Sequence, residues 1–537
     1  MDSQILNNAG FFQAVFTFLG VILVYRGLKN WFNNKANEKP ASNSTSARRR
    51  LGKNEAFMNL LSRERQGTSD VSLILSLRSE TKLIKEHVHQ ALVLLAKRQP
   101  MLRAIIRTST SSGESAAGAE DTYFEIMDGD KVTDMIDLTS SEVKARRWND
   151  VWQEVALKER GTRLLWKAVM LQEEFLSEAK CYTNTLIFNF NHCCVDGVSS
   201  MKFCQQFLHY LNGLAEGSIT SDKDISSLSL SPSFMDLLTR EGSWSLWPFL
   251  ASCLGIPWIT KLFFKKVLRR ALSHKKCNPF FAQFPPNPKL SVIPRSNMIF
   301  KIFNEIETSN IVKACRLNGC TVTGALMAAN HLAFCKLLQN AGCSCKDVLL
   351  DHHFTINSQR DCQPRPPKEY LGHFSCGQTL FFPYADHKSD FWKVAEEATK
   401  CIHDELKEEK YARQSVGFFT GFSPEEILNE AFSPLDRQNL VRLSMCSAVS
   451  SVGSFDFRKE QKHHRYKLHE CLFNALVHGL PFSFAHFNTT VNGKMSWVIK
   501  YDPSRVINGS QAQRFANLCF DYLIQICQVI EKDKSDS

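Results

Sequence analysis

A strand, a tight turn and a helix follow one another within residues 185–214, and this segment constrains the fold of the 537-residue chain most strongly. Apolar and polar residues alternate over 185–191, which predicts a strand. Asp196-Gly197 interrupts the alternation as a turn does, and apolar residues then recur at helical spacing. The end of a rigid strand therefore carries His192 in the pattern H-x-x-x-D-G, from which one imidazole can project into a cleft.

The pattern alone leaves two interpretations of His192 open: a catalyst, or a satisfied core histidine beside a turn aspartate. Cys193 and Cys194 follow it, so a thiol nucleophile is a further alternative. We favour small buried packing residues for both cysteines, because neighbours in sequence point to opposite faces of a strand or into a turn. No G-x-S-x-G elbow is present, which excludes that type of serine nucleophile.

Length and composition indicate a globular protein of two or more domains, with 44% hydrophobic and 22% charged residues. The net charge of +11 is compatible with an acidic membrane surface or a phosphorylated ligand and identifies neither. The 18 cysteines are scattered without a C-x-x-C motif, so we expect free thiols in a reducing compartment and no bound metal. No phosphate-binding loop or dinucleotide fingerprint is present, and we expect no nucleic-acid partner.

Residues 1–32 are predicted to contain a transmembrane or signal-anchor helix, since 5–25 is mostly apolar and has about the length of a membrane span. Basic residues follow it and none precedes it, which favours a cytoplasmic location for the rest of the chain. An interfacial anchor and a buried core helix are the alternatives. Residues 33–53 are predicted to form a polar, basic tether. The endoplasmic reticulum is one candidate membrane.

A second segment with membrane-like composition lies at 244–270, where tryptophan, phenylalanine and leucine precede a cluster of lysine and arginine. It can be a crossover packed between two domains, or an interfacial patch with cations on anionic lipid. We lean towards membrane contact. Residues 233–297 as a whole are predicted to be a crossover and linker.

The remaining chain divides into two regions of similar pattern, 54–232 and 298–537. Strands and helices alternate in both, which predicts a layered α/β architecture. In the second region we expect late strands at 443–449, 482–490 and 494–501. Thr323 is the expected N-cap of a helix, and Ser510 with Gln513 the expected capping box of the last one.

Several motifs show that the chain resembles the CoA-dependent acyltransferase superfamily, which includes chloramphenicol acetyltransferase, alcohol acetyltransferases, wax ester synthases and peptide-synthetase condensation domains. Its H-x-x-x-D-G signature is matched by His192, Asp196 and Gly197. Residues 91–103, ALVLLAKRQPMLR, are similar to the superfamily's A-L-x-x-L-x-x-R-H-P-x-L-R, with Gln99 in place of histidine.

Three further segments carry the same resemblance in the second region. Residues 321–326, TVTGAL, are similar to a T-V-T-x-x-L motif, and residues 357–360, NSQR, with 371–374, LGHF, to N-x-R and L-G segments. Together the motifs cover the chain from about residue 54 to its C-terminus. The resemblance implies an α/β fold of two chloramphenicol-acetyltransferase-like domains, each with a mixed sheet flanked by helices.

The resemblance also implies acyl transfer from acyl-CoA, as a co-substrate and not a permanently bound cofactor, to an alcohol or an amine. His192 would be the base that takes the acceptor's proton and later protonates the leaving thiolate. Asp196 is expected to brace the turn, with Arg360 across the domain interface as its candidate partner, and Gly197 to let the turn pack closely. Basic residues 261–276 could bind CoA phosphates instead of lipid. We expect direct transfer without an acyl-enzyme.

Two departures leave the subfamily open. Asn191 stands where wax ester synthases and condensation domains carry a first histidine. The D-F-G-W-G motif of the superfamily's plant alcohol acyltransferases is absent, and residues 450–453, SSVG, are expected in a comparable place. The predicted anchor favours a lipophilic acceptor or donor, and we expect a monomer. The rival hypotheses are a non-catalytic, membrane-anchored protein that binds lipid or a partner, and a thioester hydrolase.

Overall fold

A computed structural model describes most of the chain from residue 47 onward. The predicted anchor at 5–25 and the aromatic-basic segment at 244–270 lie outside the described residues. Within the described part, no helix is long and apolar enough to cross a membrane. The described ranges are 47–109, 121–220, 225–239, 295–343, 349–385, 390–408, 423–431, 445–458, 463–480, 482–503 and 508–535.

The first large sheet is built around the strand of the opening motif, β8 (Cys181–Phe190). This strand pairs antiparallel with β2 (Val71–Ser79) on one side and β6 (Trp166–Gln172) on the other. Beyond β6 lies β5 (Leu138–Lys144), in parallel register with it. The other edge is β13 (Lys467–Ala475), antiparallel to β2. The alternation of β8 buries Phe188 and Phe190, as the sequence predicted.

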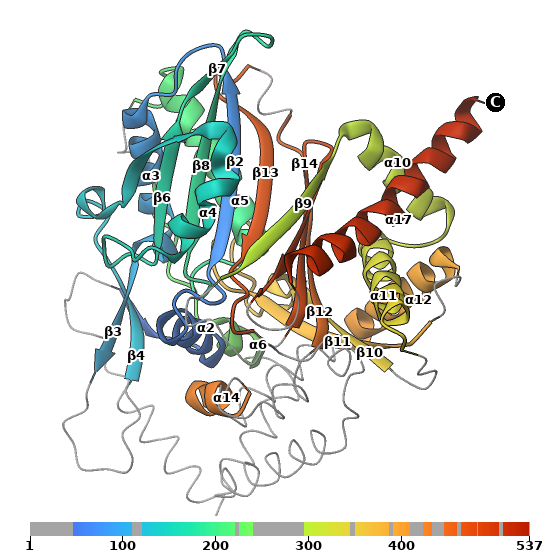
Figure 1. Cartoon of the computed structure of the whole chain (residues 1–537). Helices are drawn as coiled ribbons and strands as arrows, with labels where there is room; N and C mark the ends of the chain where they lie inside the picture. The colour runs from blue at the N-terminus through green and yellow to red at the C-terminus, as the bar shows by residue number, and fades with distance from the viewer. Residues whose placement is uncertain are drawn as a thin grey trace, which may run out of the picture.

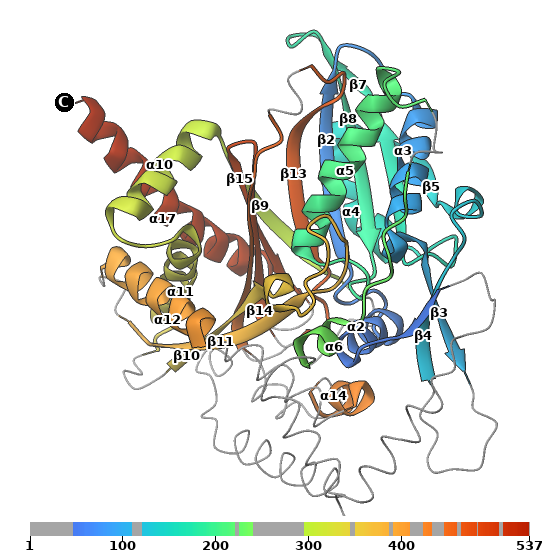
Figure 2. The same cartoon turned by 180° about the vertical axis from the view of Figure 1, so that it is seen from behind.

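Helices cover both faces of this sheet. On one face α3 (Lys85–Arg98) packs beside α5 (Gly197–Ala215), which is in front of the sheet in Figure 2. On the other face lies α4 (Trp148–Leu157), in front in Figure 1. The rings of Phe188 and Phe203 meet edge to face at 4.9 Å, so α5 is held on β8 by interlocking aromatic side chains.

The second large sheet also combines parallel and antiparallel pairs, with its central strands β10, β12 and β14 parallel. Helices α10, α11, α12 and α17 gather on one side of it (Figure 1). The strands, in spatial order, are β11 (Ser375–Pro383), β10 (Leu349–Asn357), β12 (Met445–Phe455), β14 (Phe482–Val491), β15 (Lys494–Tyr501) and β9 (Asn297–Phe303). The helices are α10 (Glu305–Leu317), α11 (Val322–Asn340), α12 (Phe391–Glu408) and α17 (Gly509–Ser535). This is the mixed-sheet α/β architecture that the resemblance implied.

Strand β13 belongs to the second half of the sequence but to the first sheet, and the sequence analysis did not predict it. Figure 1 shows it in orange beside the blue β2. Its Phe473 packs on Phe487 of the second sheet, with ring centroids 5.6 Å apart. One hydrophobic core accordingly includes buried residues of both halves. A second core lies wholly within the second half, between Phe303 and Ile526.

The folded part begins earlier than predicted. Residues 33–53 were expected to be a tether, but β1 (Arg48–Arg50) pairs with β4 (Asp121–Ile126), and Arg48 forms an ion pair with Glu125. With β3 (Ala104–Ser109) they make a small three-stranded sheet. The remaining elements are short: α2 (Lys53–Glu64), α6 (Phe234–Thr239), α14 (Pro424–Ala431), β7 (Glu174–Leu176), η1 (Pro100–Arg103), η2 (Thr133–Met135), η3 (Ala145–Arg147) and η4 (Gln359–Asp361).

Two helix caps lie two residues before the predicted positions. Thr321, not Thr323, caps α11, because its side chain accepts a hydrogen bond from the N–H of Gly324 at 3.1 Å. At α17 the reciprocal bonds join Asn508 and Gln511, not Ser510 and Gln513. In both cases a residue type that caps helices was present at the predicted position, but an equally good residue two positions earlier makes the capping bonds.

Replacement of Gly324 by alanine tests the packing of α11 on α12. The added Cβ would lie 2.7 Å from the backbone oxygen of Ala395, which cannot rotate away. We expect the variant to lose about 1–3 kcal/mol of unfolding free energy, measured by chemical denaturation. Gly129→Ala is the control, since its Cβ would lie 3.5 Å from Lys97 Cγ, an ordinary contact. Equal stability of the two variants would contradict this account.

Candidate active site

His192 is the second residue after the end of the central strand β8, at the edge of the sheet where β2 and β6 begin. Residues Val71 and Trp166 flank Phe190 in the sheet, so the strand end is anchored on both sides. The side chain is half-buried. Its Nδ1 is 3.0 Å from the carbonyl oxygen of Val195. A carbonyl oxygen only accepts, so Nδ1 must carry the proton and Nε2 the lone pair.

That tautomer leaves His192 ready to act as a base. Nε2 has no hydrogen-bond partner among the described residues. Burial lowers the pKa of His192 below its usual value near 6.5, although the neighbouring carboxylates of Asp196 and Asp70 act to raise it. The imidazole is therefore neutral at neutral pH, with an accepting nitrogen that no described protein group occupies.

Asp196 ties the turn to a segment from the other half of the chain. One carboxylate oxygen accepts from the N–H of Ser199 at 2.7 Å, which caps α5. The other accepts from the N–H of Phe374 at 2.8 Å. The backbone N–H of Asp196 donates to the oxygen of Gly372 at 3.2 Å. The carboxylate is buried and both its oxygens are occupied, which is the geometry of a brace.

The segment 369–374 meets α3 and α5 through several further bonds. Ser199 Oγ donates to the oxygen of Gly372 at 2.8 Å. Gln99, the residue in place of the superfamily's histidine, donates to the oxygen of Glu369 at 2.9 Å and accepts from the N–H of Leu371 at 3.1 Å. Two motifs that are 270 residues apart in the sequence are thereby joined side by side.

The structure does not bring Arg360 to Asp196. Arg360 lies in the short helix η4 with a side chain 55% exposed, and its nearest ion-pair partner is Asp361 at 3.5 Å. The predicted pairing between Asp196 and Arg360 is therefore replaced by bonds from backbone N–H groups. The physical reason is that backbone N–H groups of α5 and of the L-G-H-F segment occupy both carboxylate oxygens, while the N-x-R segment contacts α5 further along, at Lys202.

Gly197 is required by a close approach of two strands. A Cβ at this position would lie 2.9 Å from Val452 Cγ2 on β12 and 3.0 Å from Phe473 Cζ on β13. Both strands come from the second half of the chain. The first residue of α5 is thus in contact with residues 450–453, and any side chain here would separate the halves at the site.

Asn191, which departs from the pattern of some relatives, holds the turn from within. Its side-chain amide donates to Asn59 Oδ1 at 3.1 Å, and its oxygen accepts from the N–H of Cys193 at 3.0 Å. Cys193 and Cys194 are fully buried. Burial raises the pKa of Cys194 to about 12 and that of Cys193 well above its usual value. Neither thiol is therefore available as a thiolate nucleophile at neutral pH.

His373 is a residue of this site that the sequence analysis did not single out. Its ring lies edge to face on that of His192, with centroids 4.7 Å apart and planes at 88°. The L-G-H-F motif contained it, but only the leucine and glycine carried the resemblance. Burial lowers the pKa of His373 well below the usual value, and the proximity of His192 adds to this effect.

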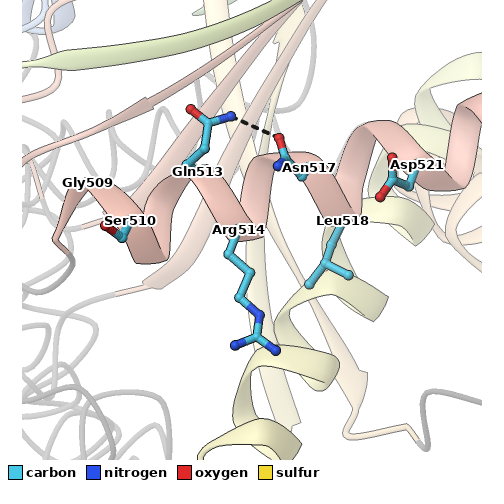
Figure 3. A pocket seen from close by; sticks show the side chains of 7 residues that line it. All are labelled: Gly509, Ser510, Gln513, Arg514, Asn517, Leu518 and Asp521. Carbon is cyan, nitrogen blue, oxygen red and sulfur yellow. Dashed lines mark hydrogen bonds between the residues drawn. The ribbon is translucent and has the colours of Figure 1, made fainter.

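No set of metal ligands occurs among the described residues. A hollow of about 610 Å³ runs along α17 and includes none of the residues of the histidine site (Figure 3). It is an open surface feature lined by one helix, and we assign it no role in the chemistry. The lining residues are Gly509, Ser510, Gln513, Arg514, Asn517, Leu518 and Asp521.

Comparisons with known families and solved structures show what the chain is similar to. A family model for alcohol acetyltransferases matches residues 139–508. No curated protein is similar enough in sequence to be matched. Among solved structures, TRI3 trichothecene 15-O-acetyltransferase from Fusarium sporotrichioides is 14% identical, with a TM-score of 0.65 over 90% of this chain and 97% of that one.

Two domains of larger biosynthetic enzymes share the fold. The condensation domain of the monacolin K polyketide synthase MokA is 11% identical, with a TM-score of 0.57 over 90% of this chain and 98% of that one. The epimerization domain of the third module of tyrocidine synthetase B is 11% identical, with a TM-score of 0.56 over 91% and 99%.

Substitution of Asp196 by asparagine tests the brace. One amide oxygen can replace one accepting oxygen, but the amide nitrogen would then face a backbone N–H and leave it unpaired. We expect a loss of about 1–3 kcal/mol in unfolding free energy, measured by denaturation. Arg360→Ala, in contrast, should change stability by no more than about 0.5 kcal/mol. Similar losses in both variants would restore the predicted Asp196–Arg360 pair.

Proposed function

Because the chain belongs to the alcohol acetyltransferase family, we propose that it transfers an acyl group from acyl-CoA to the hydroxyl of an alcohol, with His192 as the general base. The observation that carries this proposal is the hydrogen bond from His192 Nδ1 to the oxygen of Val195, which leaves Nε2 free to accept a proton. An amine is the second acceptor class. The proposal places the chemistry where β8, α5 and the segment 371–374 meet.

In the proposed reaction, the acceptor oxygen attacks the thioester carbonyl carbon as His192 Nε2 takes its proton. The carbonyl electron pair moves onto oxygen and then returns, and the carbon–sulfur bond breaks. The imidazolium gives its proton to the departing thiolate, so the products are an ester and a free thiol. Burial lowers the pKa of His192, so the imidazolium is a stronger acid and gives up this proton readily. Asp196 positions both sides of the site without receiving a proton.

The proposed acceptor is lipophilic. This rests on the apolar segment 5–25 and the aromatic-basic segment 244–270 of the sequence, and the membrane location that they indicate stays a prediction. A lipophilic alcohol dissolved in a bilayer would reach an enzyme held at the same surface more readily than a water-soluble one.

His192→Ala should reduce acyl transfer by about 10²–10⁴-fold, the contribution typical of a positioned general base. The measurement is thiol release from acetyl-CoA with a panel of alcohols and amines. His209→Ala is the matched control, because His209 is an exposed histidine on α5. Unchanged turnover in the His192 variant would contradict the proposal, and thiol release with free acid instead of ester would favour a hydrolase.

The pH dependence of kcat/KM tests the protonation state of the base. A base must be neutral, and burial lowers the pKa of His192, so the neutral form persists below the usual value near 6.5. We expect a rate that is flat around neutrality and falls only below about pH 6.5. A decline that begins above this value would show that a different or more solvated group is the base.

Direct transfer predicts that no acyl-enzyme forms. Intact mass spectrometry after mixing with acetyl-CoA, in the absence of an acceptor, should show no gain of an acetyl group. The buried, protonated thiols of Cys193 and Cys194 are the nearest alternative nucleophiles. We expect Cys193→Ala and Cys194→Ala to remain active, and a labelled enzyme that loses its label in one of these variants would overturn this prediction.

A further inference from the structure

His373 presents an unusual combination of burial and missing partners. Only 2% of the residue is exposed, and Nδ1 is enclosed by protein without a hydrogen bond. Nε2 also has no partner among the described residues. Nδ1 is one of the fully enclosed atoms and Nε2 is not, so Nε2 is the ring nitrogen that a bound molecule can reach.

The position of His373 is fixed on both sides along the chain. The oxygen of Gly372 accepts from the N–H of Asp196 and from Ser199 Oγ, and the N–H of Phe374 donates to Asp196 Oδ2. The residue between them therefore has little freedom to move relative to the start of α5. The carboxylate that caps α5 and supports the turn of His192 also holds the backbone of His373, so the two imidazoles are preorganised as a pair.

We propose that His373 is a second catalytic residue, whose ring N–H donates a hydrogen bond to the carbonyl oxygen of the acyl thioester. This inference rests on the proposed acyl transfer. As the acceptor attacks, the carbonyl electron pair moves onto that oxygen, and the N–H of His373 holds the resulting oxyanion while His192 Nε2 holds the acceptor's proton. When the carbonyl re-forms and the carbon–sulfur bond breaks, the oxyanion is discharged and the proton of His192 passes to the thiolate. His373 keeps its own proton throughout.

The geometry of the two rings allows His192 to act as the base and His373 as a hydrogen-bond donor. A centroid separation of 4.7 Å allows both to reach atoms of one carbonyl group and its attacking oxygen. Burial lowers the pKa of His373 well below the usual value, so the ring is neutral and donates one proton from one nitrogen. Nδ1 is enclosed and meets no acceptor. We therefore place the proton on Nε2. The side-chain amide of a glutamine at position 373 can donate a hydrogen bond from about the same place.

Three variants separate the hydrogen bond from the shape of the ring. His373→Phe keeps an aromatic ring without a donor, and His373→Gln restores a donor at the reach of Nε2. With acetyl-CoA and an alcohol, we expect His373→Phe to lower kcat by about 10²–10³-fold with KM little changed, and His373→Gln to recover most of this loss. His192→Ala keeps His373 and removes only the base.

A second readout requires no turnover. Acetyl-CoA labelled with ¹³C at the carbonyl is bound without an acceptor, and its carbonyl infrared band is recorded. We expect a shift to lower frequency in the unchanged protein, in His192→Ala and in His373→Gln, and loss of that shift in His373→Phe. A shift that persists in His373→Phe, or is absent in the unchanged protein with acetyl-CoA bound, overturns the role of His373.

The two readouts distinguish failure of this inference from failure of the proposed function. If His373→Phe keeps full turnover while His192→Ala loses turnover as expected, the inference is overturned and the proposed acyl transfer is left intact. A carbonyl shift that depends on His373, without ester or amide formation by the unchanged protein, supports the inference and overturns the transfer reaction. Absence of any saturable binding of acetyl-CoA overturns both.

Discussion

The buried carboxylate of Asp196 is the interaction on which the geometry of the site depends. It accepts one hydrogen bond from α5 and one from the segment 371–374, which belongs to the other half of the chain. Without these bonds two backbone N–H groups would be buried and unpaired, so the bonds are costly to break. The position of the base relative to the second half is therefore set by backbone atoms, which do not depend on the rotamer of a long side chain.

Strand β13 connects the hydrogen bonds of Asp196 with the global fold. Because β13 leaves the second half to join the first sheet, the halves cannot separate without breaking a ladder of backbone hydrogen bonds along β2. Its Phe473 lies against Gly197, and Val452 of β12 lies on the same glycine. The site is built from both halves of the chain, and contacts on each side of the H-x-x-x-D-G turn hold these halves together. It does not lie at an interface that can open freely.

The sequence predicted the elements whose information is local. The end of strand β8 and the start of helix α5 were predicted closely, because alternation of period two changes abruptly to helical spacing at Asp196-Gly197, but β8 begins four residues before the predicted start at 185. It did not predict β13, since membership of a sheet is decided by partners 390 residues away and leaves no periodic signal. Arg360 was predicted as the partner of Asp196 from a family pattern. The partners in the structure are backbone N–H groups, and no sequence pattern marks these.

The roles of Asn191 and His373 also depend on contacts between residues that are distant in the sequence. The first was noticed as a departure from relatives that carry two histidines at the strand end, and in the structure its amide supports the turn through Asn59 and Cys193. The second imidazole of this site comes instead from residue 373, close to His192 only after folding. A polar residue at the strand end holds the turn, and the imidazole next to His192 comes from the opposite half of the chain. If that ring stabilises the oxyanion, its neutrality is essential, and burial provides it. Burial also weakens His192 as a base, so the same apolar surroundings that keep His373 neutral oppose proton transfer to its neighbour, and the carboxylate of Asp196 partly compensates.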